Sequence, residues 1–90
     1  MTNVKNMNTH KTTIHAKCPL NGSWDYYTVL IETKEFIACE QIEELCDFVR
    51  GKSLEQERIA QNLHASLGVQ SKLTLLGRHG QNTELKVVIE

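Results

Sequence analysis

The residues of this chain best suited to chemistry are a cysteine and an aspartate in one short run, Cys18-Pro19-Leu20-Asn21-Gly22-Ser23-Trp24-Asp25. The proline and glycine in this run favour a turn that brings the aspartate back toward the thiol. A thiolate with a nearby acid is what addition to a multiple bond requires, because sulfur attacks carbon while the acid protonates the developing anion. For the pair alone, an incidental thiol and a turn aspartate are the commoner explanation. The pair therefore needs support from the elements around it.

Two strand-like stretches flank this turn. Residues 12–17 are rich in β-branched side chains and alternate weakly, which suits a short strand. Residues 26–33 combine aromatic and β-branched side chains and form the best-supported strand of the chain. Together they predict a hairpin with Cys18 at a strand end, a partly accessible place that favours a reactive thiol.

Two helices are predicted after the hairpin. Apolar residues at three- and four-residue spacing predict a helix over residues 38–50, which Gly51 ends. Ser53 as a cap, with Gln56 as its capping-box partner, predicts the start of a second helix that ends at Gly68.

Two further strands complete the predicted domain. Residues 72–76 and 85–89 are strand-like and are joined by a polar segment that contains glycine. The order ββααββ predicts an α+β fold, with an antiparallel four-stranded sheet and two helices packed on one face. We expect residues 11–90 to form this single domain. Residues 1–10 are polar and are expected to form a flexible leader.

The composition of the 90 residues is that of an ordinary globular domain, with 40% hydrophobic and 23% charged residues. A net charge of −1 does not indicate the basic surface that sequence-independent nucleic-acid binding needs. The sequence shows neither a bilayer-spanning stretch nor a signal peptide, so we expect a cytoplasmic protein with no membrane partner. The odd count of three cysteines favours reduced thiols. So small a core also favours self-association that covers strand edges.

The run from Cys18 to Asp25 resembles the signature of the queuosine-pathway nitrile reductases, QueF, in which Cys-Pro, two residues, Gly, two residues and Asp lead into a strand. The family also has an Arg followed seven residues later by a Glu at the start of its second helix, and here Arg50 and Glu57 have that spacing. The segment Leu75-Leu76-Gly77-Arg78 is similar to the apolar pair, glycine and basic residue that end the family's third strand. The resemblance covers almost the whole predicted domain.

This resemblance implies the tunnelling fold, or T-fold, in which ββααββ subunits form barrels around a pore and bind purine-like substrates at subunit interfaces. It implies Cys18 as the nucleophile that forms a covalent thioimide with 7-cyano-7-deazaguanine, and Asp25 as the proton donor. Glu57 would bind the substrate by accepting hydrogen bonds from the N–H groups of the ring edge. Its alternative role is a first-turn carboxylate that interacts with the helix dipole. The implied partners are further copies of the chain and a 7-deazapurine, free or within tRNA.

The departures from the family concern the cofactor. The reductases carry a Glu-Ser-Lys-Ser-Leu-Lys type motif linked to NADPH binding, where this chain has the acidic segment Cys39-Glu40-Gln41-Ile42-Glu43-Glu44-Leu45. This segment would repel the phosphates of NADPH, so no cofactor is expected. Gln56 replaces the family's His, and residues 82–84 replace its Arg-Gly-Gly.

A related branch, the QueF-like amidinotransferases, is similar to the reductases but does not use NADPH. In that branch ammonia attacks the thioimide and gives the amidine of archaeosine tRNA. Loss of the cofactor motif with retention of Cys18 and Asp25 favours this reaction. The alternatives are an NADPH-dependent reductase of 7-cyano-7-deazaguanine and a non-catalytic purine-binding module.

Other polar residues are further candidates. Trp24 could stack on a heterocycle and bind substrate, with a hydrophobic plug as an equal alternative. His79 and His15 could line the site, although surface or packing roles are commoner for such residues. Cys39 and Cys46 are predicted to be buried structural thiols on one helix face. The histidines and cysteines show no metal-ligand spacing, so no metal is expected.

Overall fold

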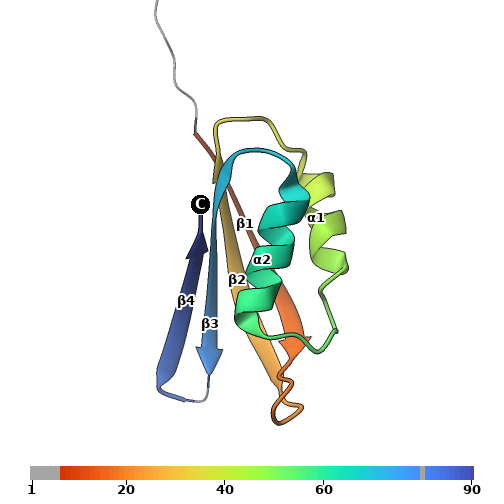
Figure 1. Ribbon diagram of the computed structural model, residues 1–90, viewed down its shortest axis with the longest axis vertical. Coiled ribbons are helices and arrows are strands. Elements are labelled where there is room, and N and C mark those ends of the chain that lie inside the picture. The colour runs from red at the N-terminus through yellow and green to blue at the C-terminus, as the bar shows by residue number, and fades with distance from the viewer. Residues whose placement is uncertain (1–6, 80) are drawn as a thin grey trace, which may run out of the picture.

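The computed structural model describes residues 7–79 and 81–90, which form two layers, a four-stranded sheet and a pair of helices (Figure 1). The strands are antiparallel and lie in chain order, β1-β2-β3-β4. Both helices cover the same face of the sheet. The predicted α+β class and ββααββ order are confirmed. The elements are β1 (Asn8–Lys17), β2 (Trp24–Thr33), α1 (Cys39–Asp47), α2 (Gln56–Leu67), β3 (Ser71–His79) and β4 (Thr83–Ile89).

Alternating side chains place the core on one face of the sheet. In β2, Tyr27, Val29 and Ile31 are buried, while the residues between them are only partly buried. Apolar residues of β2 and β3 lie directly opposite each other, Val29 with Leu75 and Ile31 with Leu73. Successive residues of a strand point to opposite faces, so these pairs form continuous apolar rows beneath the helices.

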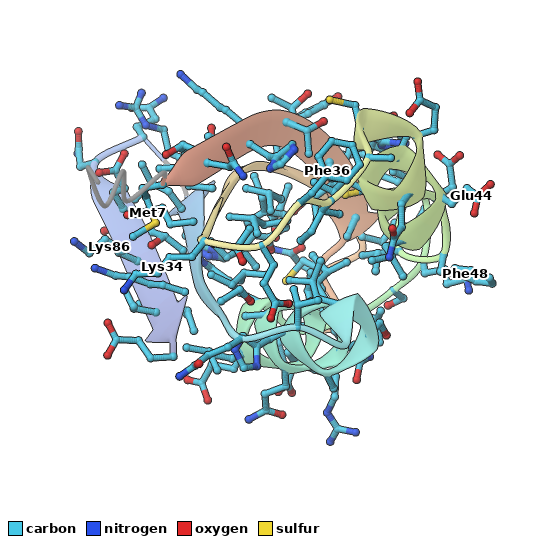
Figure 2. The ribbon with its side chains drawn as sticks, turned by 90° about the horizontal axis from the view of Figure 1, so that it is seen from above. Met7, Lys34, Phe36, Glu44, Phe48 and Lys86 are labelled. Atoms are coloured by element: carbon cyan, nitrogen blue, oxygen red, sulfur yellow. The ribbon has the colours of Figure 1, made fainter. Side chains whose placement is uncertain are left out.

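Each helix completes the core with one apolar face. α1 buries Ile42 and Cys46. The corresponding apolar residues of α2 are Ile59, Ala60, Leu63 and Leu67. α2 ends at Gly68, whose φ of 70° lies in the left-handed region that favours glycine. In the view along the strands, Glu44 and Phe48 project outward from α1 and its C-terminal end (Figure 2). Within the described residues, neither helix has the length and apolar character needed to cross a membrane.

Arg50 links the end of α1 to the first strand. Its guanidinium donates a hydrogen bond to the backbone oxygen of Thr13 at 2.9 Å. It also forms ion pairs with Glu43 at 2.9 Å and Asp47 at 2.7 Å. These contacts hold the acidic α1 against the edge strand β1.

Several element boundaries differ from the predicted ones, since the strands extend beyond residues 12–17, 26–33, 72–76 and 85–89. β1 begins at Asn8, which pairs with Thr33 of β2, so the predicted leader of residues 1–10 overlaps the strand. Residues 1–6 of that leader lie outside the described residues. α1 ends at Asp47 rather than at residue 50, because the chain then tightens into a turn.

The capping box predicted at Ser53 and Gln56 is wrong. α2 begins at Gln56 with Glu55 as its N-cap, and no side chain caps it. Ser53 instead forms an isolated parallel bridge with Lys17 at the end of β1. The Gln56 side chain is thereby free to turn toward the sheet, where it is 5% exposed.

Candidate active site

Three segments that are far apart in the sequence meet at one end of the sheet (Figure 1). They are the β1–β2 turn, the first turn of α2, and the end of β3 with the start of β4. An open cleft of about 270 Å³ lies between them. Four of the five predicted site residues line it, namely Cys18, Asp25, Glu57 and His79. The fold therefore gathers these residues from three different elements.

Hydrogen bonds within the β1–β2 turn hold Cys18 in place. Its backbone N–H donates to the oxygen of Ser23 at 2.8 Å, and its oxygen accepts from the N–H of Gly22 at 2.8 Å. The side-chain oxygen of Asn21 accepts from the N–H of Ser23 at 2.9 Å and from its hydroxyl at 2.7 Å. Gly22 adopts a φ of 73°, which L side chains rarely adopt. The thiol is half-buried at the strand end, on the same cleft as Asp25.

Asp25 and Tyr27 lie two residues apart on β2 and therefore share the helix-facing side of the sheet. The Asp25 side chain is 12% exposed, and the Tyr27 hydroxyl donates a long hydrogen bond of 3.4 Å to its Oδ2. Burial and then the charge of Asp25 raise the pKa of Tyr27 to about 12, so the phenol stays a neutral donor to the carboxylate. Tyr27 was not predicted as a site residue. Its position two residues after Asp25 in a strand is the signal that marks it.

Gln56 is a second cleft residue that was not predicted, since its polar side chain was assigned to helix capping. Its Nε2 donates to the backbone oxygens of Leu75 at 3.0 Å and Leu85 at 2.8 Å. Its Oε1 lies 2.6 Å from Nε2 of His79. The other ring nitrogen, Nδ1, lies 3.9 Å from Oδ2 of Asp25. A chain of polar contacts thus runs from the start of α2 through His79 to the candidate acid.

Glu57 lies in the first turn of α2 and lines the cleft beside Gln56. Its side chain is exposed. The partial positive charge of a helix N-terminus favours a carboxylate at this position. The position suits both roles considered for Glu57, a ligand acceptor and a partner of the helix dipole.

Trp24 does not line the cleft. It precedes Asp25 in β2, so its side chain points to the opposite face of the sheet. There its ring lies 5.3 Å from that of His15, in an edge-on arrangement, and 5.2 Å from the Nζ of Lys17. Neither Trp24 nor His15 is therefore in a position to bind a ligand in this cleft, and the expected stacking or lining role does not fit the structure.

The two cysteines of α1 differ in environment. Cys46 is buried, as predicted, and burial raises the pKa of its thiol. Cys39 is exposed, so its predicted burial is wrong; it lies at the first residue of α1, before the apolar face reaches the core. Across residues 7–79 and 81–90, no group of three or more His, Cys, Asp or Glu side chains is placed to hold a metal ion.

The architecture matches a known enzyme structure. No protein-family model matches the sequence, and comparison with curated proteins finds no match. The crystal structure of the archaeosine synthase QueF-Like in the apo form superimposes with a TM-score of 0.82. The match has 23% sequence identity and covers 92% of this chain and 90% of that chain. The chain therefore has the fold of the QueF-like enzymes, and the predicted tunnelling fold of its subunit is confirmed.

Proposed function

We propose that this protein is a nitrile-processing T-fold enzyme that joins Cys18 covalently to 7-cyano-7-deazaguanine and releases an amidine after attack by ammonia. The observation that carries the proposal is one cleft lined by Cys18, Asp25 and Glu57. A nucleophile, an acid and a ring-edge acceptor are the three groups that the reaction needs. The archaeosine synthase with the same fold supports it.

In the first step the sulfur of Cys18 bonds to the nitrile carbon and one π bond of the nitrile breaks. Asp25 accepts the proton lost by the thiol and gives it to the nitrogen. In the second step ammonia attacks the thioimide carbon and the carbon–sulfur bond breaks. The departing sulfur takes up the proton that ammonia loses, so the two steps consume one ammonia and regenerate the enzyme. Glu57 would hold the ring by accepting its N–H donors.

The charge on α1 favours ammonia over NADPH as the second reactant. The helix has no basic residue between its ends, and its acidic residues are Glu40, Glu43, Glu44 and Asp47. Such a surface repels the phosphates of a nucleotide cofactor. A reductase would have to bind NADPH through other residues.

A second copy of the chain is expected to complete the site. Leu20 and Leu85 line the cleft yet are 93% and 42% exposed, so the apolar rim of the cleft is open to solvent in one subunit. β1 and β4 are the edge strands of the sheet, with unpaired backbone groups along their outer sides. Joining edges between copies would form the T-fold barrel and cover this rim.

Intact-protein mass spectrometry tests the function directly. The protein is incubated with 7-cyano-7-deazaguanine, as the free base or within tRNA, and then with ammonium or NADPH. We expect the native chain and Cys39→Ala each to gain the mass of one ligand, and Cys18→Ala to gain none. Ammonium should then release the bound ligand from Cys18 as the amidine. Discharge by NADPH alone would make the protein a reductase. Binding without an adduct would make it a non-catalytic module.

A further inference from the structure

The orientation of the Gln56 amide is fixed by its surroundings. Two backbone oxygens, of Leu75 and Leu85, accept hydrogen bonds from one end of the side chain, and that end must therefore be the NH₂ group. The other end is an oxygen, which can only accept. The side chain is 5% exposed, so water does not compete for these contacts.

This orientation fixes the tautomer of His79. The ring nitrogen 2.6 Å from Oε1 of Gln56 must carry a hydrogen, because an amide oxygen cannot donate one. In the neutral ring the unprotonated nitrogen is then Nδ1. This atom lies on the side of Asp25, 3.9 Å from its Oδ2.

We propose that Gln56 is a positioning residue that holds His79 in the Nε2–H tautomer, so that Nδ1 exchanges protons with Asp25 during the nitrile reaction. The inference rests on the proposed function and goes beyond it, since that function assigns no role to Gln56 or His79. It gives Asp25 a neighbour that can store the proton of the thiol.

The first step needs no proton from outside Cys18, Asp25 and His79. The thiol proton of Cys18 passes through Asp25 to Nδ1 of His79 and leaves a thiolate and an imidazolium. The thiolate attacks the nitrile carbon, His79 returns its proton to Asp25, and Asp25 passes that proton to the nitrogen. His79 ends the step neutral, and no further reagent is required.

The test uses two variants with different defects. His79→Gln keeps an amide N–H for Oε1 of Gln56 but cannot carry a proton. Gln56→Met keeps a long side chain but removes the acceptor that selects the tautomer. The rate of adduct formation is measured between pH 6 and 9, and ligand affinity is measured separately in a Cys18→Ala background. The titratable groups that share the cleft with His79 are Cys18, Asp25, Tyr27, Glu55 and Glu57.

We expect His79→Gln to form the adduct about 10²-fold more slowly at pH 7, the usual size of a general acid–base contribution. The deficit should shrink as the pH rises, since hydroxide can then remove the thiol proton without His79. Gln56→Met should show a smaller deficit in the same direction, and neither variant should change ligand affinity.

Three results would overturn the inference. A His79→Gln variant with the native rate, or with a deficit that is equal at every pH, would show that His79 holds the structure without moving a proton. A fall in affinity that accounts for the slower rate would have the same meaning. If the native protein itself forms no adduct, the proposed function fails and the proton relay with it. If the native protein forms the adduct and one of the other results is found, the proton relay alone fails.

Discussion

The ring of Tyr27 packs directly over the α-carbon of its cross-strand partner Gly77. A β-carbon at position 77 would overlap the ring atoms Cδ1 and Cε1 and would come within 3.1 Å of Oε1 of Gln56. Glycine is thus required here for lack of space, since its φ does not lie in the left-handed region. A side chain at position 77 would therefore disturb both the buried ring of Tyr27 and the contact of Gln56 with His79.

Gly77→Ala should destabilise the protein by about 1–3 kcal/mol, because a rigid ring and a buried amide must both move to admit the methyl group. Urea denaturation of the native chain and the variant measures this difference. Arg78→Ala, at the next, exposed position, serves as the control and should change stability by less than about 0.5 kcal/mol. Equal stability of Gly77→Ala and the native chain would mean that the ring is not held where the structure places it.

Much of the fold follows from local sequence patterns. The aromatic and β-branched composition of residues 26–33 predicts a strand, and the helical spacing after residue 38 predicts a helix that is buried on one face. The predicted end of α1 at residue 50 is wrong because Val49 is buried at helical spacing although the helix has already ended. The spacing of apolar residues indicates which residues are buried. It does not show whether their backbone groups form helical hydrogen bonds.

The candidate site was predictable in part. Cys18 and Asp25 lie on one turn, so a motif finds them, whereas Gln56 bonds to carbonyls 19 and 29 residues farther along the chain. No local pattern reveals such partners. Trp24 was misplaced for a simpler reason, because one step along a strand reverses the face. Counting from Asp25 would have put Trp24 on the outer face.

Arg50→Met should destabilise the protein by about 1 kcal/mol at pH 7, since hydrogen bonds to Thr13 and Glu43 are lost while the apolar stem is kept. Arg50, followed by Thr12, lowers the pKa of Glu43 from its ordinary 4.5 through hydrogen bonds. A lowered pKa in the folded state stabilises the protein above pH 4.5, and that contribution is lost as the pH falls below it.

Urea denaturation of both proteins at pH 7 and at pH 3.5 measures the effect. The stability gap between the native chain and Arg50→Met should narrow at the lower pH, because the contribution of the lowered Glu43 pKa is lost below pH 4.5. Arg58→Met, an exposed site on α2, is the matched control. A gap of equal size at both values would show that the ion pair with Glu43 does not contribute to the stability that Arg50 provides.

The phenol of Tyr27 should lose its proton at a higher pH than an ordinary tyrosine does. Its pKa is raised to about 12, first by burial and then by Asp25, so the folded state holds the phenolic proton more tightly than the unfolded chain does. The associated stability is present below pH 10 and is lost as the pH rises from 10 to 12. The ultraviolet absorbance of the phenolate follows the titration. Tyr27→Phe should remove this late component. A late part of the titration that is the same in the native chain and in Tyr27→Phe would contradict the buried position of Tyr27.

The three thiols should react with iodoacetamide in an order set by their surroundings. Cys39 is exposed and should be modified first, Cys18 is half-buried in the cleft and should follow, and Cys46 should not react in the folded protein. Burial raises the pKa of Cys46 and so withholds both access and the thiolate that reacts. Peptide mass spectrometry assigns the sites, and all three thiols should be modified in denaturant.

7-Cyano-7-deazaguanine should protect Cys18 from iodoacetamide and leave the modification of Cys39 unchanged, because Cys18 alone of the three lines the cleft. Protection of Cys39 by the ligand, or modification of Cys46 in the folded state, would contradict the structure described here.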